Sequence, residues 1–149
     1  MELNTKRLKL VPCSNGALSA YFTKDYALGP HIAMYLEELK KDESSLGWGV
    51  WLVIDRQTNK IIGDMGFKGK PDLDKSVEIG YGITPTEQNK GYATEALHRI
   101  IEWAFNSNMV NTISAECLVG NTSSIKVLEK LKMQKIQEVD GMLYWKLNK

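Results

Sequence analysis

The chain has 149 residues, of which 43% are hydrophobic and 25% are charged. This balance is that of an ordinary globular protein and argues against a disordered chain. Lys plus Arg count 19 and Asp plus Glu count 18, giving a formal charge of +1, so a general nucleic-acid binder is not expected.

The two cysteines, Cys13 and Cys117, lie far apart and form no C-x-x-C pair. We therefore expect two buried thiols in a reducing compartment, with neither a disulfide framework nor a zinc site. The longest apolar stretch, residues 50–54, is too short to span a bilayer, and the charged N-terminus has no apolar signal region. These features predict a cytoplasmic protein without a membrane segment.

The first third of the chain predicts one strand and two helices. Alternation at Leu8 and Leu10 indicates a short strand, which Pro12 ends. Ser14 is placed to cap the first helix. The apolar positions of that helix are Ala17, Leu18, Tyr21 and Phe22. Those of the second helix are Ile32, Tyr35, Leu36 and Leu39, at i, i+3, i+4 and i+7.

The middle of the chain predicts three strands. Residues 48–54 are rich in aromatic and β-branched side chains, and 55–59 have turn composition, so 60–68 should return as the partner strand of a hairpin. A third strand spans 76–84. Its alternation puts Val77, Ile79, Tyr81 and Ile83 on one face, and Glu78, Gly80 and Gly82 on the other.

The helix after Pro85 has the clearest periodicity in the chain. Its apolar stripe comprises Ala93, Ala96, Leu97, Ile100, Ile101, Ala104 and Phe105. A strand over 111–118 and a helix over 121–131 follow. Two strands, 134–139 and 142–147, then form a hairpin around an Asp-Gly turn.

This order of elements predicts a mixed α/β fold in a single domain over residues 1–149. Most of the sheet should be antiparallel. The strand over 76–84 and the strand over 111–118 are joined by a helix, so they should lie side by side and parallel.

The segment Gln88-Asn89-Lys90-Gly91-Tyr92-Ala93 lies between the third strand and the periodic helix. Backbone N–H groups at a helix start have no partners within the helix, and with the helix dipole they favour an anion such as a pyrophosphate. Gly91 would let the backbone approach closely. The alternative is an ordinary helix start that contains a glycine. No P-loop or G-x-G-x-x-G pattern occurs, which disfavours a nucleotide or dinucleotide site of those types.

Together with the preceding Glu78-Ile79-Gly80-Tyr81, this Gln-x-x-Gly-x-Ala pattern resembles the acetyl-CoA loop of the GCN5-related N-acetyltransferase (GNAT) superfamily. Residues 5–10 resemble the first strand of the RimJ/RimL-like subgroup, the ribosomal-protein N-terminal acetyltransferases. Residues 121–131 resemble the late helix of that subgroup. The resemblance covers nearly the whole chain and implies a GNAT-like fold, with a twisted sheet of about seven strands and four helices.

The resemblance implies acetyl-CoA as acyl donor and no metal. The loop amides, with Thr94, would hold the pyrophosphate, the strand end near Ile83 would pair with the pantetheine arm, and Asn121 and Ser124 would face the cofactor from the other side. The implied cofactor-binding residues are Ile83, Gln88, Asn89, Lys90, Gly91, Tyr92, Ala93, Thr94, Asn121 and Ser124.

The chain departs from the family pattern in the late helix. Many members carry there a Tyr that protonates the leaving thiolate, and the matching position is Leu128. Ser124 is then the best remaining donor, and a hydroxyl in the first turn of a helix is its alternative interpretation. The subgroup usually ends this helix with Gly-Phe, where this chain has Lys132-Met133.

Acetyl transfer needs a neutral amine, and a carboxylate could accept the proton of an ammonium. Glu78 is the first candidate for this base, because two glycines beside it leave room for a ligand. Glu116 on the neighbouring strand is the second. For both, an ion pair or a solvated strand face is the alternative. His31 and His98 have no partner at metal-ligand spacing, and His98 is expected at the surface.

We therefore predict an N-acetyltransferase that transfers an acetyl group directly to a primary amine, either a protein N-terminus or a small molecule. The acceptor would lie against residues 14–47 and the last hairpin. Aromatic side chains such as Trp48 and Tyr35 could form its wall, with core packing as the favoured alternative for most of them. The alternatives are a non-catalytic acyl-CoA-binding or sensing module and a protein-interaction domain. Open strand edges near the termini favour a homodimer.

Overall fold

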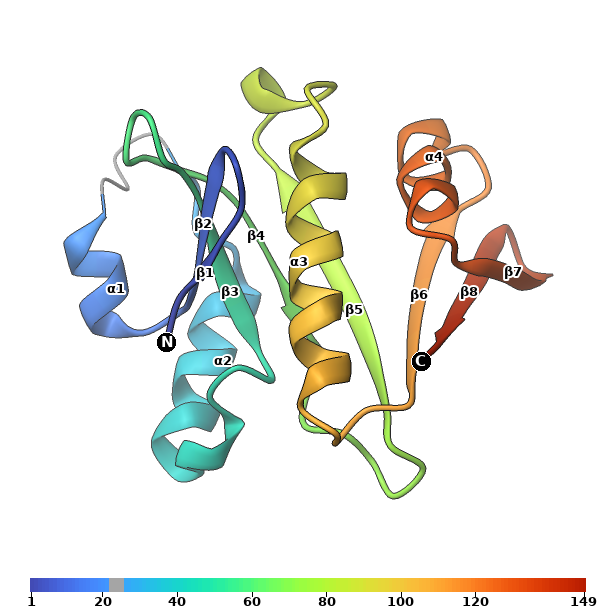
Figure 1. Cartoon of the computed structure of the whole chain (residues 1–149), viewed down its shortest axis with the longest axis horizontal. Coiled ribbons are helices and arrows are strands. Elements are labelled where there is room, and N and C mark those ends of the chain that lie inside the picture. The colour runs from blue at the N-terminus through green and yellow to red at the C-terminus, as the bar shows by residue number, and fades with distance from the viewer. Residues whose placement is uncertain (22–25) are drawn as a thin grey trace.

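The computed structural model of the protein describes residues 1–21 and 26–149. Within this part of the chain, one sheet runs in the order β1-β2-β3-β4-β5-β6-β8-β7 (Figure 1). The strands are β1 (Leu3–Asn4), β2 (Leu8–Pro12), β3 (Val50–Asp55), β4 (Ile61–Phe67), β5 (Ser76–Ile83), β6 (Thr112–Leu118), β7 (Gln134–Val139) and β8 (Met142–Asn148). The pair β5 and β6 is parallel and the other neighbouring pairs are antiparallel, which confirms the mixed sheet.

The sheet has eight strands where about seven were expected. The additional strand is β1, in which Leu3 pairs with Leu10 and Asn4 with Lys9. A turn closed by a hydrogen bond from the Thr5 amide to the Leu8 carbonyl joins it to β2. Two residues are too short an alternation to identify as a strand from sequence.

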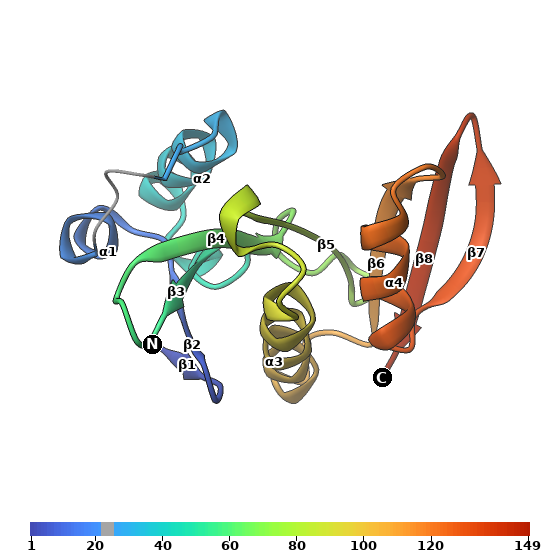
Figure 2. The same cartoon turned by 90° about the horizontal axis from the view of Figure 1, so that it is seen from above.

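The helices of the described chain are α1 (Asn15–Ala20), α2 (Pro30–Lys41), α3 (Tyr92–Asn106) and α4 (Thr122–Lys130), with 3₁₀ turns η1 (Glu43–Ser45) and η2 (Pro85–Glu87). Figure 2 shows α1 and α2 on one face of the sheet and α3 and α4 on the other. One buried cluster lies under α1 and α2, and a larger one lies between the sheet, α3 and α4. None of the described helices is long and apolar enough to cross a membrane.

Local sequence features explain where these helices form. The Ser14 hydroxyl accepts a hydrogen bond of 3.0 Å from the Ala17 amide, which confirms the expected cap of α1. Of the α3 stripe, Ala96, Leu97 and Ile100 are fully buried, as its period predicts. Phe22, which was expected in the first helix, lies outside the described residues.

The strand expected from residue 48 begins only at Val50. The Trp48 amide donates to the Ser45 carbonyl, and Gly47 has a φ of +90°, so this segment is a turn. The Trp48 ring is buried and packs on Phe67 and Trp103, with ring centroids 5.4 and 4.8 Å away. The aromatic content of this segment therefore marked burial and not a strand.

The sheet divides between β5 and β6. These strands pair only from Ser76 opposite Thr112 to Glu78 opposite Ser114, and then diverge (Figure 1). The rest of β5, residues 79–83, pairs with β4 alone. One backbone edge of β5 therefore has no strand partner beside the N-terminal end of α3, and the functional residues gather around this point.

Candidate functional site

The loop before α3 has a backbone shape that exposes the start of that helix. Asn89 and Gly91 have φ angles of 63° and 83°, in the left-handed region. Gly91 is the N-cap residue and supplies no capping side chain, so the amides of the first turn have no side-chain acceptor. Such amides, at the positive end of a 15-residue helix, favour an anion. The sequence-predicted residues Tyr92, Ala93 and Thr94 form this first turn.

Arg7 holds this loop from the turn between β1 and β2. Its Nη1 donates to the Lys90 carbonyl at 3.0 Å, and its Nε lies 2.7 Å from Glu95 Oε1 on α3. The guanidinium also lies over the Tyr92 ring, 4.3 Å from the centroid. Partial burial alone would raise the pKa of Glu95, but hydrogen bonds from Thr5 and Arg7 lower it below its usual value. The loop is therefore fixed by side chains almost 90 residues away.

The side chains of Gln88 and Lys90 make hydrogen bonds to residues close by in the sequence. Gln88 Nε2 donates to the Ile83 carbonyl at 2.9 Å, which folds the loop back onto the end of β5. The Lys90 ammonium lies 3.0 Å from Glu87 Oε2, and this hydrogen bond raises the pKa of Lys90. The structure thus brings Ile83 together with the predicted loop residues.

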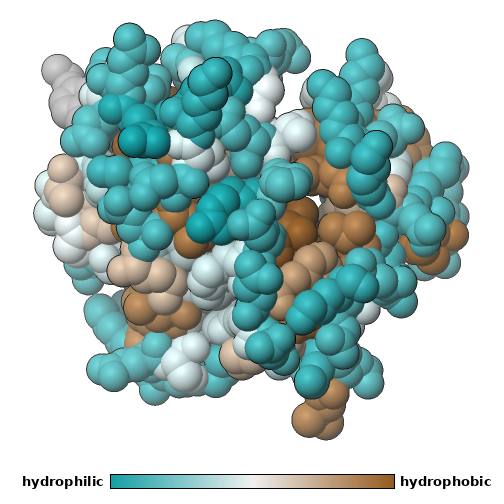
Figure 3. All heavy atoms as spheres, in the orientation of Figure 1, coloured by the Kyte–Doolittle hydropathy of each residue, from teal (hydrophilic) through white to brown (hydrophobic). Residues whose placement is uncertain are grey.

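The opposite wall of the divide is the start of α4. Asn121 is the N-cap residue, and its Oδ1 accepts hydrogen bonds from the Ser124 amide and the Ser123 hydroxyl, both at 3.1 Å. Asn121 therefore caps the helix, and the Ser124 hydroxyl is left for other contacts. In the space-filling view, the surface is hollowed between the α3 side and the α4 side, with hydrophobic atoms along the hollow (Figure 3).

Tyr81 reaches this divide from β5. Its hydroxyl is buried and makes no hydrogen bond of ordinary geometry within the described chain. Burial raises the pKa of Tyr81, and the nearby Ser124 side chain offsets part of the rise. A buried hydroxyl without a partner is costly, so it marks a place where a ligand group would be bound.

Leu128 and Met133, where the sequence differs from the family pattern, are both buried in the core. Leu128 is 1% exposed, and its aliphatic side chain offers no proton donor at this position. Met133 is also buried against the larger cluster, where it packs beneath the end of α4. The change from Gly-Phe to Lys132-Met133 therefore concerns packing, and Lys132 takes the left-handed backbone, with a φ of 67°.

Glu78 lies in an ion pair with Lys68, which directly follows β4, at the point where β5 and β6 part. The Lys68 ammonium also lies 4.0 Å from Glu116 Oε1 on β6. The two candidate carboxylates thus share one lysine, and both side chains are about one-third exposed, at 34% and 38%. The ion-pair alternative describes their geometry, and their role in proton transfer stays a prediction.

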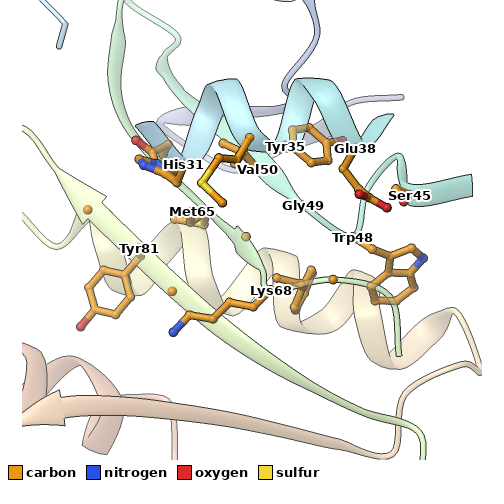
Figure 4. Close-up of a pocket in the computed structure, with 17 residues that line it drawn as sticks. His31, Tyr35, Glu38, Ser45, Trp48, Gly49, Val50, Met65, Lys68 and Tyr81 are labelled. Atoms are coloured by element: carbon orange, nitrogen blue, oxygen red, sulfur yellow. The ribbon is translucent and has the colours of Figure 1, made fainter. Parts of the chain in front are cut away.

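A cavity of about 610 Å³ lies between α2 and strands β3 to β5. Figure 4 shows His31, Tyr35 and Glu38 on the side of α2 that faces the strands, and the Tyr81 ring projecting away from α2. Gly80 and Gly82 of β5 line the cavity, and a Cβ at Gly82 would meet no atom within 4 Å. Of the two expected acceptor walls, the helical region lines this cavity, and the last hairpin contributes no lining residue.

Three polar side chains meet at one end of the cavity. Asp64 of β4 accepts hydrogen bonds from the Tyr26 hydroxyl, a short contact, and from His31 Nε2 at 2.7 Å. Burial, followed by the contact with Asp64, raises the pKa of Tyr26, so its hydroxyl remains a donor. This cluster fixes the start of α2 on the sheet.

The residues that the sequence did not identify as part of the site are Arg7, Tyr81 and Asp64, which is the partner of His31. Tyr81 carried one signal, a hydroxyl at the end of an apolar stripe beside the predicted loop, and Arg7 lay in the motif of residues 5–10. The other contacts join residues 33 to 90 positions apart, and no spacing rule covers them. His98 is exposed, as expected. No metal-binding group of His, Cys, Asp and Glu occurs in residues 1–21 and 26–149.

Comparisons with known proteins bear on this geometry. The profile of the family described as "Acetyltransferase (GNAT) domain" matches residues 8–134. The "Uncharacterized N-acetyltransferase YjdG" of Bacillus subtilis (strain 168) is 35% identical over 100 residues, which are 67% of this chain and 60% of that protein. The chain spans about half to three-fifths of the length of the curated relatives it matches.

Solved structures show the same fold. A GNAT-family acetyltransferase from Bacillus anthracis superposes with a TM-score of 0.72 at 24% identity, covering 99% of this chain and 98% of that one. RimL, described as a ribosomal L7/L12 alpha-N-protein acetyltransferase in complex with coenzyme A, superposes with a TM-score of 0.78 at 12% identity, with the same two coverages. At these identities the likeness concerns the fold.

Proposed function

The chain belongs to the acetyltransferase (GNAT) family, and from this premise we propose that it transfers an acetyl group from acetyl-CoA directly to a primary amine. One observation carries the proposal. The uncapped start of α3 and the unpaired edge of β5 lie next to each other where the sheet divides. Together they offer amides for a phosphate and a strand edge for an extended amide-bearing arm.

The residues present fit acetyl-CoA in three respects. Gly91 has no Cβ to block the first-turn amides, one edge of residues 79–83 has no strand partner, and the Tyr81 hydroxyl is buried beside Ser124 without a well-formed hydrogen bond. When bound, acetyl-CoA supplies the acetyl group as a thioester with a good leaving group. We propose that residues 88–94 hold its pyrophosphate, the Ile83 end of β5 its pantetheine arm, and Asn121 and Ser124 its opposite side.

Glu78 is our proposed proton acceptor for the amine, directly or through a water molecule. Glu78 lies at the parting of β5 and β6, two residues before Gly80, which lines the cavity where an amine can enter. Its pairing with Lys68 holds it in one position. The amine gives its lone pair to the acetyl carbon and loses one proton, and the sulfur leaves with the electron pair of the broken C–S bond.

Ser124, assisted by Tyr81, is our proposed proton donor to the departing sulfur, and a solvent water replaces the proton that its hydroxyl gives up. The two side chains are neighbours on opposite walls of the divide, and burial raises the pKa of Tyr81, so its hydroxyl acts by hydrogen bonding to Ser124 and not as the acid itself. A thiol titrates near 8.5, so a thiolate needs less help to leave than an alkoxide would. A serine hydroxyl can therefore replace the Tyr that other members carry at the position of Leu128.

We place the protein in the cytoplasm. Cys13 and Cys117 are both free and buried, in different core clusters on opposite faces of the sheet. Burial raises the pKa of the Cys13 thiol to about 11, so this thiol stays protonated and acts as an apolar core group.

The test is calorimetric titration with acetyl-CoA of the wild type, Gly91→Glu and Gly141→Glu. Gly141 lies in the β7–β8 turn with a φ of 80°, so the control substitution carries the same backbone strain away from the loop. We expect the wild type and Gly141→Glu to bind, and Gly91→Glu to lose affinity at least 100-fold. The wild type should then acetylate at least one primary amine.

Two outcomes would contradict the proposal. A folded wild type that binds no acetyl-CoA would show that the family fold has lost its cofactor here. Binding without transfer to any amine would support the acyl-CoA-binding or sensing module instead.

A further inference from the structure

The cavity under α2 opens onto the same stretch of β5 that we assign to the cofactor, but from the other face of the sheet. Gly80 and Gly82 form its floor at that strand. We propose that this cavity takes a primary amine whose attached group is apolar and compact, an aryl-alkyl or branched-alkyl monoamine, and that it rejects polycationic amines. This inference rests on the proposed function and names its acceptor class.

The size and lining of the cavity point to an apolar group. Its volume of about 610 Å³ is within the range of small-molecule sites. Met34, Val50, Met65, Trp48 and Phe67 contribute to its walls, and all but Met34 are buried. A group bound there gains contact with large apolar side chains and loses water contact, which favours hydrocarbon over hydroxylated or charged groups.

The charges of the cavity argue against several ammonium groups. Asp64 is already engaged on both oxygens, Oδ1 by His31 and Oδ2 by Tyr26. Lys68 adds a cation, which Glu78 balances. Asp64 forms an ion pair with His31 only when that ring is protonated, and Glu38, at the exposed rim, has no ion-pair partner among the described residues. These carboxylates can attract one ammonium at the polar end or the rim, whereas a polyamine would bring further charges into apolar surroundings.

The same surroundings assist the chemistry. An alkyl ammonium titrates near 10.4 in water, so its neutral form is rare at neutral pH. Transfer into an apolar cavity disfavours the charged form. Because the lining is mostly apolar and both Asp64 oxygens already accept a hydrogen bond, the cavity favours the neutral amine, which is the form that attacks an acetyl group.

The substituent can belong to a free amine or to the first residue of a peptide, because both present a primary amine beside an apolar group. The two sources share the chemistry that the cavity selects. They differ in what extends beyond the rim, and the experiment separates them.

The test measures release of the coenzyme A thiol by the purified full chain. The panel holds 2-phenylethylamine and 3-methylbutylamine, then ethanolamine, spermidine and kanamycin, and peptides that begin with Phe or Ser. Hydrophobic pockets discriminate between substituents by roughly 10- to 200-fold. We expect the apolar amines, the Phe peptide or both to exceed the polar acceptors at least tenfold in kcat/KM. Use of the free amines identifies a small molecule as the source, and use of the Phe peptide alone identifies a protein N-terminus.

Substitutions within the cavity sharpen the test. Gly82→Leu projects a side chain into open space, because a Cβ there meets no atom within 4 Å and the backbone is not left-handed. It should raise KM for the apolar acceptor at least tenfold while acetyl-CoA affinity stays within twofold. Gly16→Leu, on the exposed surface of α1, is the matched control and should change neither value.

A second variant keeps the proposal falsifiable if Gly82→Leu fails to fold. Met34 is 72% exposed at the rim, so Met34→Glu spares the core and adds one carboxylate. It should shift the ratio of spermidine to 2-phenylethylamine turnover towards spermidine at least threefold. A wild type that prefers spermidine, kanamycin or the Ser peptide would overturn the inference while leaving the proposed function intact. Failure to acetylate any amine would overturn both.

Discussion

The loop before α3 and the cavity under α2 serve the same stretch of β5, but they are built differently. The loop relies on the backbone: two left-handed residues and a set of amides within seven consecutive positions. The cavity relies on side chains from α2, β3, β4 and β5, which are brought together over 50 positions of sequence. The phosphate groups of the cofactor are identical in every catalytic cycle, so fixed backbone donors suit them. Selection of the amine acceptor depends instead on side chains, which can vary.

This difference implies that the two sides should respond separately to substitution. Changes at the loop should alter cofactor affinity, and changes at the cavity should alter acceptor use. Groups at the divide between β5 and β6 should alter turnover much more than affinity, because both ligands would meet there.

The largest effect is expected at that divide. Ser124→Ala and Tyr81→Phe each remove one hydroxyl, and the double variant removes both the proposed proton donor and the hydroxyl that assists it. General acid catalysis contributes about 10²- to 10⁴-fold, and a thiolate leaving group places this case at the lower end. We expect kcat of the double variant to fall about 100-fold, with acetyl-CoA affinity within threefold of the wild type, as measured by steady-state kinetics and calorimetry.

Thr122→Ala is the matched control, because Thr122 lies on the exposed first turn of α4. The two single variants test the sharing of the role. If each lowers kcat only slightly and the double variant lowers it strongly, either hydroxyl can donate. A double variant with unchanged kcat would show that water protonates the sulfur.

The next effect separates the loop from the cavity. Arg7→Ala removes the hydrogen bond to the Lys90 carbonyl and the ion pair with Glu95, so the loop is no longer held in its binding shape. Acetyl-CoA affinity should fall about tenfold, a loss of about 1.4 kcal/mol, with an unchanged ranking of acceptors. Arg99→Ala, which removes an exposed ion pair with Glu102 on the same helix, should leave affinity unchanged. An altered acceptor ranking in Arg7→Ala would break the separation of the two sides.

The difference between the two regions also explains what the sequence could predict. Periodicity identified α3, and turn chemistry identified the β7–β8 hairpin, because both depend on nearby residues. The loop from Gln88 to Thr94 was proposed to bind the cofactor because its Gln-x-x-Gly-x-Ala pattern is local and resembles the family's loop, and this role stays a prediction. Alternation alone placed Glu78 on the face of β5 opposite the apolar side chains. Its ion pair with Lys68 is compatible with a purely structural role as well as with a catalytic one.

The cavity could not be predicted in the same way. In the sequence, Asp64 lies in a glycine-containing strand and belongs to no motif. His31 has no partner at metal-ligand spacing. Their hydrogen bond depends on how α2 lies across β4, which is set by packing of Ile32 and Tyr35 against the sheet. Arg7 belonged to a recognised motif, but its contact with Lys90 requires the sheet to place residues 83 positions apart side by side.

A smaller effect is expected within the cavity. In Asp64→Asn, the amide can accept from either Tyr26 or His31 through its oxygen, but its NH₂ group faces the other donor. We expect the start of α2 to loosen, kcat/KM for the preferred amine to fall about fivefold, and acetyl-CoA affinity to stay constant. Asp74→Asn, in the exposed turn before β5, is the control. Lost cofactor affinity in Asp64→Asn would show that the cavity and the loop are coupled.

The smallest effect concerns acid stability on the loop side. Glu95 has a lowered pKa in the folded chain, so between that value and its usual one the unfolded state binds more protons. Its hydrogen bonds with Thr5 and Arg7 therefore stabilise the fold fully above the usual pKa, and the contribution is lost as the pH falls through the lowered value. At pH 7, Glu95→Gln should lower the free energy of unfolding by roughly 1–2 kcal/mol. Urea unfolding at pH 7 and pH 3 should show this difference shrinking in acid, and Glu102→Gln, an exposed pair on the same helix, should show almost none. A difference that is equal at both pH values would mean that Glu95 stabilises the loop by packing, and the clamp around Arg7 would then not depend on charge.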